Sequence, residues 1–523
     1  MDAIDNIAAL YIKIKGELDM YEDYVSNKLT SYTERLFNIV NSQPDGIKNE
    51  AQKLLYGLID KRKKYQTVYM YSAALSINYD NGIFEEFLEW IPEEKGISPN
   101  TGYFLYYQLK HCMFARPKLE SENAKYLLWK LLQKTVNGFK EELKDILLPI
   151  PREERDENFA LVITEQILSY THAPSKTAFE RCKTMITKMQ KQVFLINTAE
   201  TMSLTGAIPF FRTLSATYND TITEEEHLLW KGTAIPYFQC DKDMPDVGVI
   251  RTILELVRDK KPGTVISIGG SSIVGNLIDF MTPVLTVGLC PSDLAFTTTA
   301  YQTISVDLSP EHKRLLQRVG KTENHVIKGT FTYELPEQTT KFSRQQLGIP
   351  EEKFVLVTAG ARLDTDIDGG FADMLKKAVK HDICIVLLGT FNCERFIKDN
   401  PELKGHVFYF GFVQDVLAYM EICDLFVNPE RKGGGASAIE AMFKGIPAVS
   451  THYGDVAANI GEDFLTDSYD GMLDIIMKYK NDNTFYGQMS KKAKARAEIV
   501  MDIENEFVRI IHEFKKRCED SER

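Results

Sequence analysis

The sequence predicts an α/β protein in which an all-α region precedes two tandem, doubly wound α/β domains. Residues 1 to about 150 carry helical apolar patterns without the Gly/Pro-punctuated runs that are typical of strands. After residue 158, short apolar runs alternate with helical stretches in two successive series. A chain of 523 residues also exceeds what one hydrophobic core supports, so we expect several domains.

The first region, 1–150, is predicted to be a non-repeating helical domain. Its main helical patterns cover Ile4–Val40, Ala51–Tyr65 and Ala124–Ile146. Trp, Gly, Tyr and Pro do not recur at a spacing of about 34 residues, which argues against a tetratricopeptide array. The Pro-punctuated, charged segment Leu148–Glu157 indicates a domain boundary.

The first α/β domain is predicted over residues 158–335. Its candidate strands are Phe159–Ile163, Gln192–Asn197, Thr264–Ile268 and Val284–Val287. Their continuous apolar character is typical of parallel strands that are covered on both faces.

The second α/β domain is predicted over residues 342–500. Its candidate strands are Phe354–Thr358, Ile383–Leu388, Val407–Phe410, Leu425–Val427 and Ala448–Ser450. Doubly wound folds bind ligands at the carboxyl ends of their strands, so we expect the site in the cleft between the two domains.

The last residues, 501–523, are predicted to form a helix with a charged tail. The apolar stripe of this helix consists of Ile503, Phe507, Ile510, Ile511 and Phe514. This apolar face must pack against another element, and we expect the helix to cross back to the first α/β domain.

Composition excludes several classes of protein. The formal net charge of −12, from 74 acidic and 62 basic residues, repels polyanions such as nucleic acids. No signal pattern begins the chain and no stretch approaches the ~18 to 20 apolar residues that span a bilayer, so we expect a cytoplasmic protein without a transmembrane segment. The eight cysteines are scattered, without CxxC pairs or histidines at metal-ligand spacing, which predicts no metal site.

The strongest local signal is the segment Asp424–Met442, in which a buried strand enters a basic, glycine-rich turn that opens a helix. Glycines at a helix N-terminus let a pyrophosphate approach backbone N–H groups, and the helix dipole favours its charge. Glu440, about two turns into the helix, can accept hydrogen bonds from a sugar diol. The alternative is a turn whose glycines only permit tight packing. The candidate donor contacts of this segment are Lys432, Gly433, Gly434, Gly435, Ser437 and Glu440.

The run from Asp424 to Pro447 resembles the donor-site signature of retaining glycosyltransferases of the GT-B fold, family 4 (glycosyl transferases group 1). Residues Phe342–Leu363 resemble the linker and first strand of that family's donor domain, and Gly411–Val413 resembles the loop that meets the nucleotide base. The resemblance is specific over 342–500, weak over 158–341 and absent before residue 158. It implies the GT-B architecture of two Rossmann-like domains.

The resemblance also implies roles for several residues. Arg362 and the glycine amides would bind the donor diphosphate, and Glu440 would take the ribose hydroxyls. Val413 would lie against the base. The leaving nucleotide would be stabilised electrostatically without a metal, and the only small molecule required is the nucleotide-sugar co-substrate, with no further cofactor.

Two departures from the family pattern concern the phosphate and sugar contacts. Lys432 stands where the family has the first Glu of its Glu-x7-Glu element, so the donor hexose lacks its usual carboxylate contact. Ile367 stands where a phosphate-binding Lys is expected, and our hypothesis is that Lys432 supplies that charge. Asp364, Asp366 and Asp368 alternate like a metal motif, but a helix-entry turn is the favoured interpretation.

Two loops of the first α/β domain are candidates for the opposite wall of the cleft. His172 follows the first strand and could orient or deprotonate an acceptor hydroxyl, because histidine titrates near neutrality. Capping or packing is the alternative role for this side chain. Gly270 and Ser271 lie in a second strand–turn–helix segment, where we expect contacts with the donor.

We therefore expect transfer of a hexose or N-acetylhexosamine from a nucleotide sugar, with UDP favoured over GDP, onto a hydroxyl of a glycan or protein. The helical domain is expected to bind a macromolecular acceptor or another protein subunit, and a structural appendage is the alternative. Two other functions stay open: a catalytically silent GT-B subunit of an active transferase, and a sugar-nucleotide epimerase.

Overall fold

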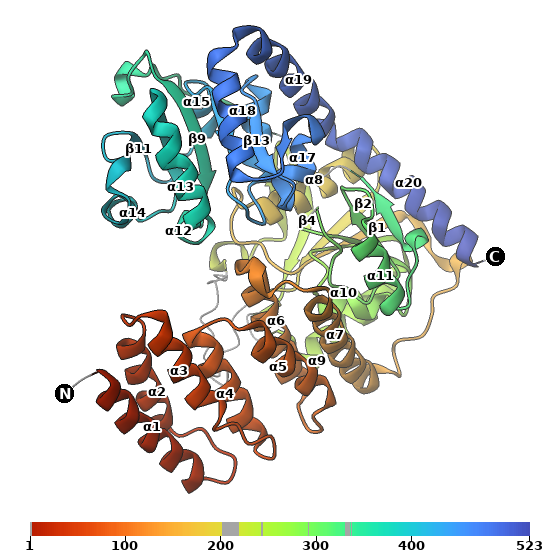
Figure 1. The fold of residues 1–523 in the computed structure, drawn as a ribbon. Coiled ribbons are helices and arrows are strands. Elements are labelled where there is room, and N and C mark those ends of the chain that lie inside the picture. Colours follow the sequence, from red (N-terminus) through yellow and green to blue (C-terminus); the bar gives the residue numbers. More distant parts are fainter. Residues whose placement is uncertain are drawn as a thin grey trace.

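The computed structural model describes residues 3–200, 219–241, 244–290, 292–329, 335 and 337–522. In these residues a helical region is followed by a domain around an eight-stranded sheet and a domain around a six-stranded sheet (Figure 1). The predicted α/β architecture is confirmed. None of the helices in the described ranges is long and apolar enough to cross a membrane.

Residues 3–143 contain the helical region, whose α-helices are α1 (Ala3–Met20), α2 (Asn27–Val40), α3 (Asp45–Tyr56), α4 (Lys64–Ile77), α5 (Asn81–Glu93), α6 (Pro99–Ala115) and α7 (Glu122–Leu143). Ser26, Asp80, Ser98 and Ser121 cap α2, α5, α6 and α7 by accepting a hydrogen bond from a first-turn backbone N–H. These caps satisfy donors that a helix start leaves unpaired.

The helical region has two different cores. Helices α1–α4 pack around side chains such as Ile14 and Leu55, which form a core of their own. Helices α5–α7 share one continuous core with the first sheet, in which Leu128 of α7 belongs to the same cluster as Leu161 and Val265 of the strands. Helix α4 lies between the two cores and also contributes Val68, Tyr71 and Leu75 to this second one. The second half of the helical region is therefore part of the first α/β domain in packing terms.

The first sheet has the strand order β3-β4-β2-β1-β5-β6-β7-β8. Its strands are β1 (Asp156–Thr164), β2 (Gln192–Asn197), β3 (His227–Trp230), β4 (Thr233–Gln239), β5 (Pro262–Ile268), β6 (Val284–Val287), β7 (Tyr301–Ile304) and β8 (Val326–Lys328). Its strand pairs are parallel except the hairpin β3–β4. The sequence analysis missed this hairpin and the short strands β7 and β8. Alternate side chains of β1 enter opposite cores: Leu161 faces the core of α7, and Val162 faces the core of α8.

The helices of this domain are α8 (Ala173–Thr187), α9 (Val247–Lys260), α10 (Ile273–Ile278) and α11 (Pro310–Arg318). The second sheet is parallel throughout, in the order β11-β10-β9-β12-β13-β14. Its strands are β9 (Phe354–Gly360), β10 (Ile383–Gly389), β11 (Val407–Tyr409), β12 (Leu425–Val427), β13 (Ala448–Thr451) and β14 (Leu465–Thr466). Its helices are α12 (Leu363–Asp366), α13 (Gly369–Ala378), α14 (Cys393–Asp399), α15 (Val416–Met420), α16 (Gly435–Phe443), α17 (Gly454–Ile460), α18 (Tyr469–Asn481) and α19 (Asn483–Met501).

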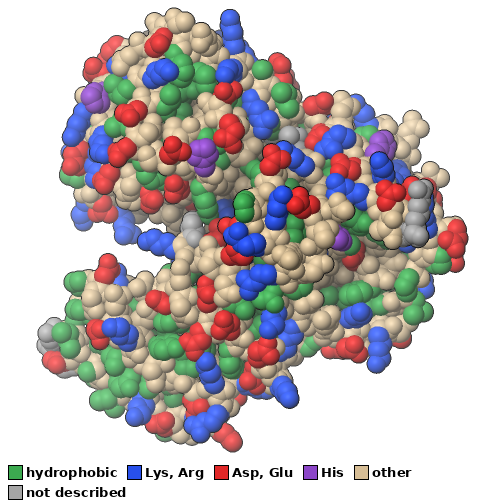
Figure 2. Space-filling model, turned by 45° about the vertical axis from the view of Figure 1, so that its right-hand side comes forward, with side chains coloured by type: hydrophobic (Ala, Val, Ile, Leu, Met, Phe, Trp, Pro, Cys, Tyr) green, Lys and Arg blue, Asp and Glu red, His purple; other side chains and the backbone are tan. Residues whose placement is uncertain are grey.

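The surface is hollowed between the second α/β domain and the helical region. In the space-filling view this hollow opens between the upper and lower lobes, and Lys and Arg side chains project at its rim (Figure 2).

The last helix, α20 (Ile503–Glu522), leaves the second α/β domain and packs on the first, next to α8 (Figure 1). Phe507, Ile511 and Phe514 are buried in the same core as Val162 of β1. The helix thus covers one face of the first sheet, although it follows the whole second domain in the sequence.

Replacing Ile511 with Ala tests this packing. We expect the Ile511→Ala variant to lose about 2 to 5 kcal/mol of unfolding free energy, because a fully buried aliphatic side chain is removed and a cavity remains. Urea unfolding followed by circular dichroism measures it. Ile499→Ala is the matched control, since Ile499 on α19 is 60% exposed; equal losses in both variants would contradict the packing role of α20.

Candidate functional site

The candidate site lies where β9 and β12 end. These neighbouring strands are followed by connections that run to opposite sides of the sheet, since the order changes direction between them. Parallel α/β sheets bind ligands at this type of crevice. Arg362 follows β9 directly, and the glycine turn follows β12.

Gly433, Gly434 and Gly435 form the turn that opens α16. Gly433 and Gly434 have positive φ angles of 90° and 81°, a conformation that other residues rarely adopt. A Cβ at Gly435 would lie 2.2 Å from Asn459 Nδ2 and 3.1 Å from the carbonyl oxygen of Asp455, so a larger residue would force the Asn459 side chain to move. Packing therefore explains part of the glycine pattern, and the remaining question is what the turn's N–H groups bind.

The N–H of Gly433 already has a partner. It donates to Asp455 Oδ2 at 2.7 Å, and Asp455 Oδ1 accepts from Ser292 Oγ of the first α/β domain at 2.8 Å. Burial raises the pKa of the Asp455 carboxyl, although these hydrogen bonds oppose the shift. A phosphate that binds Gly433 must therefore displace this carboxylate.

Arg362 lies against the glycine turn. Its Nη2 donates to the carbonyl oxygen of Lys432 at 2.7 Å, and its guanidinium carbon is 4.5 Å from the ring centroid of Phe114. The side chain is 24% exposed, so part of the guanidinium still faces the cleft. Arg362 is thus placed to bind an anion beside the turn.

Lys432 does not point into open space. Its ammonium is bound by Glu120 of the α6–α7 connection and lies 3.0 Å from Asp293 Oδ2. Burial alone would lower the pKa of Lys432, but the carboxylates of Asp293 and Glu120 outweigh it and hold the pKa well above its usual range. The charge of Lys432 is therefore compensated by protein carboxylates.

Glu440 lies on α16 and is only 6% exposed. Burial raises the pKa of its carboxyl to about 7, while the charge of Lys176 opposes the shift. Among the described residues, no hydrogen-bond donor to this carboxylate is found. A buried carboxyl with free acceptor sites is suited to binding ligand hydroxyls.

Ser437 lies half-buried on the first turn of α16, and Val413 lies half-buried in the loop after β11, at the same edge of the sheet. Phe412, next to Val413, is 75% exposed. The roles of Ser437 and Val413 as donor contacts stay predictions.

The turn at Gly270 and Ser271, where we expected contacts with the donor, binds other residues of the chain instead. The side chain of Ser271 is fully buried, and its Oγ is bound by Tyr106 at 2.8 Å and by Lys110, both on α6. The N–H of Ser271 donates to Glu165. The turn is thus occupied by contacts within the chain.

His172 begins α8, but its side chain makes no capping hydrogen bond. Its Nδ1 is buried without a partner among the described residues. Burial lowers the pKa of His172 to about 4, so the ring is neutral at pH 7. A capping role for this side chain is excluded, whereas packing and proton acceptance by the neutral imidazole both stay open.

The three alternating aspartates have structural roles. Asp364 accepts from Asn392 N at 2.9 Å, Asp366 pairs with Arg431 at 3.2 Å, and Asp368 caps α13. Among the described residues, no group of His, Cys, Asp or Glu side chains is arranged to hold a metal ion.

Helix α6 contributes residues that the sequence analysis missed. Tyr106 and Lys110 contact Ser271, and Phe114 lies on Arg362. His111, on the same helix, has a buried Nδ1 without a partner among the described residues. The spacing of these residues brings them to one side of the helix, but no local motif marks them as cleft residues.

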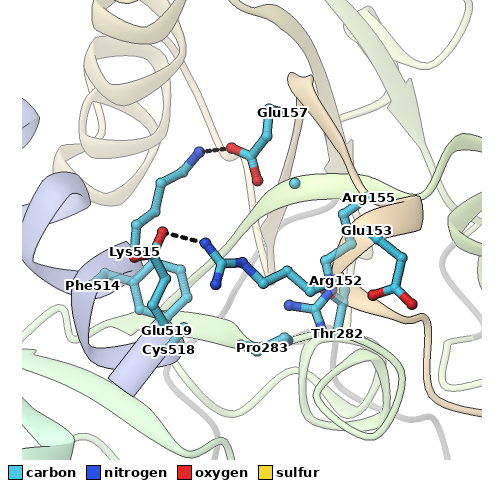
Figure 3. A pocket seen from close by; sticks show the side chains of 11 residues that line it. Arg152, Glu153, Arg155, Glu157, Thr282, Pro283, Phe514, Lys515, Cys518 and Glu519 are labelled. Carbon is cyan, nitrogen blue, oxygen red and sulfur yellow. Dashed lines mark hydrogen bonds and ion pairs between the residues drawn. The ribbon is translucent and has the colours of Figure 1, made fainter. Parts of the chain in front are cut away.

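Two cavities have similar sizes but different positions. A cavity of about 620 Å³ lies between all three parts of the chain and is lined by residues that include Glu120, Asp293, Lys432 and Tyr453. The other, of about 650 Å³, lies between the start of β1 and α20, where Arg152 pairs with Glu519 and Lys515 with Glu157 (Figure 3). It is at the amino ends of the strands, so we do not assign the reaction to it.

Residues 339–496 match the family model described as glycosyl transferases group 1, which confirms the resemblance of the C-terminal domain. The match supports glycosyl transfer from a nucleotide sugar as the general activity. No curated protein sequence matches the chain.

The solved structures that the chain resembles show the GT-B fold. An O-GlcNAc transferase mutant of Thermobaculum terrenum is 12% identical, with 100% of this chain and 99% of that chain covered and a TM-score of 0.54. A glycosyltransferase of Rickettsia africae is 11% identical, with 69% and 98% covered and a TM-score of 0.48. HepE of Anabaena, solved with UDP-glucose, is 14% identical, with 68% and 99% covered and a TM-score of 0.46.

The raised pKa of Glu440 predicts a pH-dependent stability difference. Because the folded-state pKa of about 7 exceeds the ordinary 4.5, the wild type loses stability as pH rises between these values, by up to about 3 kcal/mol. Glu440→Gln removes this loss, so the variant should be the more stable protein at pH 8 and equal to the wild type near pH 4. Urea unfolding from pH 4 to 8 measures it, with the exposed Glu498→Gln as control; a difference that does not change with pH would contradict the shift.

Proposed function

We propose that this chain, which has the GT-B fold and a group 1 glycosyltransferase domain at residues 339–496, transfers a hexose or N-acetylhexosamine from a nucleotide sugar to a hydroxyl of a glycan or protein in the cytoplasm. UDP is the favoured nucleotide. The observation that carries the proposal is Glu440, a buried carboxyl without a hydrogen-bond donor among the described residues, on the helix that the glycine turn opens. Such a group is suited to the ribose diol of a nucleotide.

In this proposal Arg362 binds the donor diphosphate together with the amides of the glycine turn. Its fixed guanidinium would stabilise the negative charge that develops on the leaving nucleoside diphosphate, without a metal ion. Val413 and its neighbours would contact the base. We do not extend the role of phosphate ligand to Lys432, because its ammonium is held by Glu120 and Asp293.

The acceptor side of the proposal rests on His172 and the hollow next to the helical region. A neutral imidazole with an unpartnered Nδ1 can take a proton from an acceptor hydroxyl, although its low pKa makes it a weak base. We place the acceptor in the hollow between the helical region and the second α/β domain (Figure 2). Similarity over the whole chain to an O-GlcNAc transferase is a reason to test proteins as acceptors.

A catalytically silent subunit is the second candidate function. It is favoured because carboxylates of the chain already bind the backbone N–H groups that could bind a phosphate. Asp455 accepts from Gly433 N, and Glu165 accepts from Ser271 N and Ser272 N. Release of nucleoside diphosphate from a sugar nucleotide by the isolated protein distinguishes the two functions, because a silent subunit releases none.

The proposed donor site is tested by thermal stabilisation with UDP-, GDP-, ADP- and dTDP-sugars. A ligand that binds only the folded state raises the melting temperature by mass action. We expect a UDP-sugar to give the largest shift. Arg362→Ala should weaken its binding about ten- to a hundred-fold, because a hydrogen-bonded charge is lost.

Arg395→Ala is the matched control, since Arg395 on α14 has a side chain that is 79% exposed. The Arg395→Ala variant should bind the same sugar nucleotide as the wild type. Absence of a shift with every nucleotide would refute the donor site and favour the silent subunit.

A further inference from the structure

A cluster of buried charges joins the three parts of the chain. Glu120 and Lys125 come from the helical region, Asp293 from the first α/β domain and Lys432 from the second. Lys432 is bound by Glu120, and both Lys432 Nζ and Lys125 Nζ lie 3.0 Å from Asp293 Oδ2. We call these four residues the junction cluster.

Stability alone is a poor explanation for the junction cluster. Each of its side chains exposes 10% or less of its surface. Removing charges from water costs about as much free energy as their mutual attraction returns, so a buried ion network is weak evidence of stabilisation. Buried charges that line a cavity are instead frequent at ligand sites. The junction cluster lines the cavity of about 620 Å³, and its Lys432 directly precedes the glycine turn in the chain.

The two carboxylates of the junction cluster differ in what they can still bind. Asp293 Oδ2 accepts from two lysines, and Asp293 Oδ1 accepts from Leu294 N at 2.9 Å and faces His312 at 3.4 Å. Its acceptor sites are therefore filled. Among the described residues, Glu120 accepts from Lys432 through Oε1 and from Tyr453 OH, at 2.8 Å, through Oε2. Lys125 Nζ lies 4.0 Å from Glu120 Oε1, which is an ion pair but is too long for a hydrogen bond. A carboxylate has about four acceptor sites, so Glu120 has about two left.

We propose that Glu120 binds a hydroxyl of the donor's hexose, with Lys432 and Tyr453 holding the carboxylate in place. This inference rests on the proposed function. Lys432 stands where the group 1 enzymes that the domain resembles have their hexose-binding Glu, and the structure brings the carboxylate of Glu120 to the end of that lysine side chain. A residue of the helical region thereby replaces a missing carboxylate of the donor domain.

The rest of the cavity has the chemistry of a sugar site. Its lining includes the hydroxyls of Ser292, Ser309 and Tyr453, and it combines carboxylates with lysines, so that a neutral polyol finds both donors and acceptors. The buried Oγ of Ser305, also in the lining, has no partner among the described residues. A hexose carries hydroxyls that can satisfy such groups.

The experiment compares UDP with UDP-glucose and UDP-N-acetylglucosamine by isothermal titration calorimetry. Glu120→Gln should raise the Kd of the better sugar nucleotide about ten- to a hundred-fold, because a charge-assisted hydrogen bond to the hexose is lost. Glu120→Gln should not change the Kd of UDP, because UDP lacks the hexose. Glu122→Gln is the matched control: Glu122 is two residues away and also forms an ion pair with the first α/β domain, through Arg314 at 2.8 Å, but does not line the cavity.

Each other outcome contradicts a specific statement. If Glu120→Gln weakens the binding of UDP as much as that of the sugar nucleotide, Glu120 has a purely structural role and the inference is overturned. An unchanged Kd for the sugar nucleotide would also overturn it. If the wild type binds none of the three ligands, the proposed UDP donor fails, and the assignment of Glu120 fails with it.

Glu120→Asp serves if Glu120→Gln does not fold. It keeps the charge and the pairing with Lys432 but shortens the side chain. We expect Glu120→Asp to raise the Kd of the sugar nucleotide less than Glu120→Gln would, and to leave the Kd of UDP unchanged. A raised Kd of UDP in this variant would also overturn the inference.

Discussion

The first sheet must have both faces covered, and the rest of the structure depends on how this is achieved. A parallel sheet exposes apolar side chains on two sides, which its own crossover helices normally cover. Here α7 from the helical region packs on the face of Leu161, and α20 from the end of the chain packs on the face of Val162. Because α7 is fixed in this way, its neighbour α6 and the connection at Glu120 are brought to the glycine turn of the second domain.

Loops at the carboxyl ends of strands leave backbone N–H groups that need partners even without a ligand. In this chain, carboxylate side chains accept the hydrogen bonds of these N–H groups. Asp455 accepts from Gly433, Glu165 from Ser271, and Glu200 from Ile273 and Val274. Burial raises the pKa of Glu200 to about 7, which shows how strongly the surroundings disfavour its charged form. A phosphate that enters the cleft would therefore exchange with an existing anion, so binding and local rearrangement are coupled at Gly433.

Local signals in the sequence were sufficient for the central strands of both sheets and for the glycine turn, but not for the shorter strands β3, β4, β7, β8 and β14. Continuous apolar runs such as Phe354–Thr358 predict buried strands, and the stripe of α20 predicts a docked helix, because both patterns lie within a few residues. The partners of Lys432 could not be predicted in this way, since Glu120 is 312 positions away and carries no motif. The hairpin β3–β4 was missed although Lys231 and Gly232, both with positive φ, form the kind of two-residue turn that signals a hairpin.

The position of α20 affects how the chain folds during its synthesis. The last strand of the first sheet, β8, is complete at Lys328, but the face that α20 covers stays open until residues up to Phe514 have been made. At the usual speed of translation this interval lasts about 10 to 40 s. During it only α8 covers this face of the sheet, and the apolar side chains beside α8 that α20 later buries stay exposed on the growing chain.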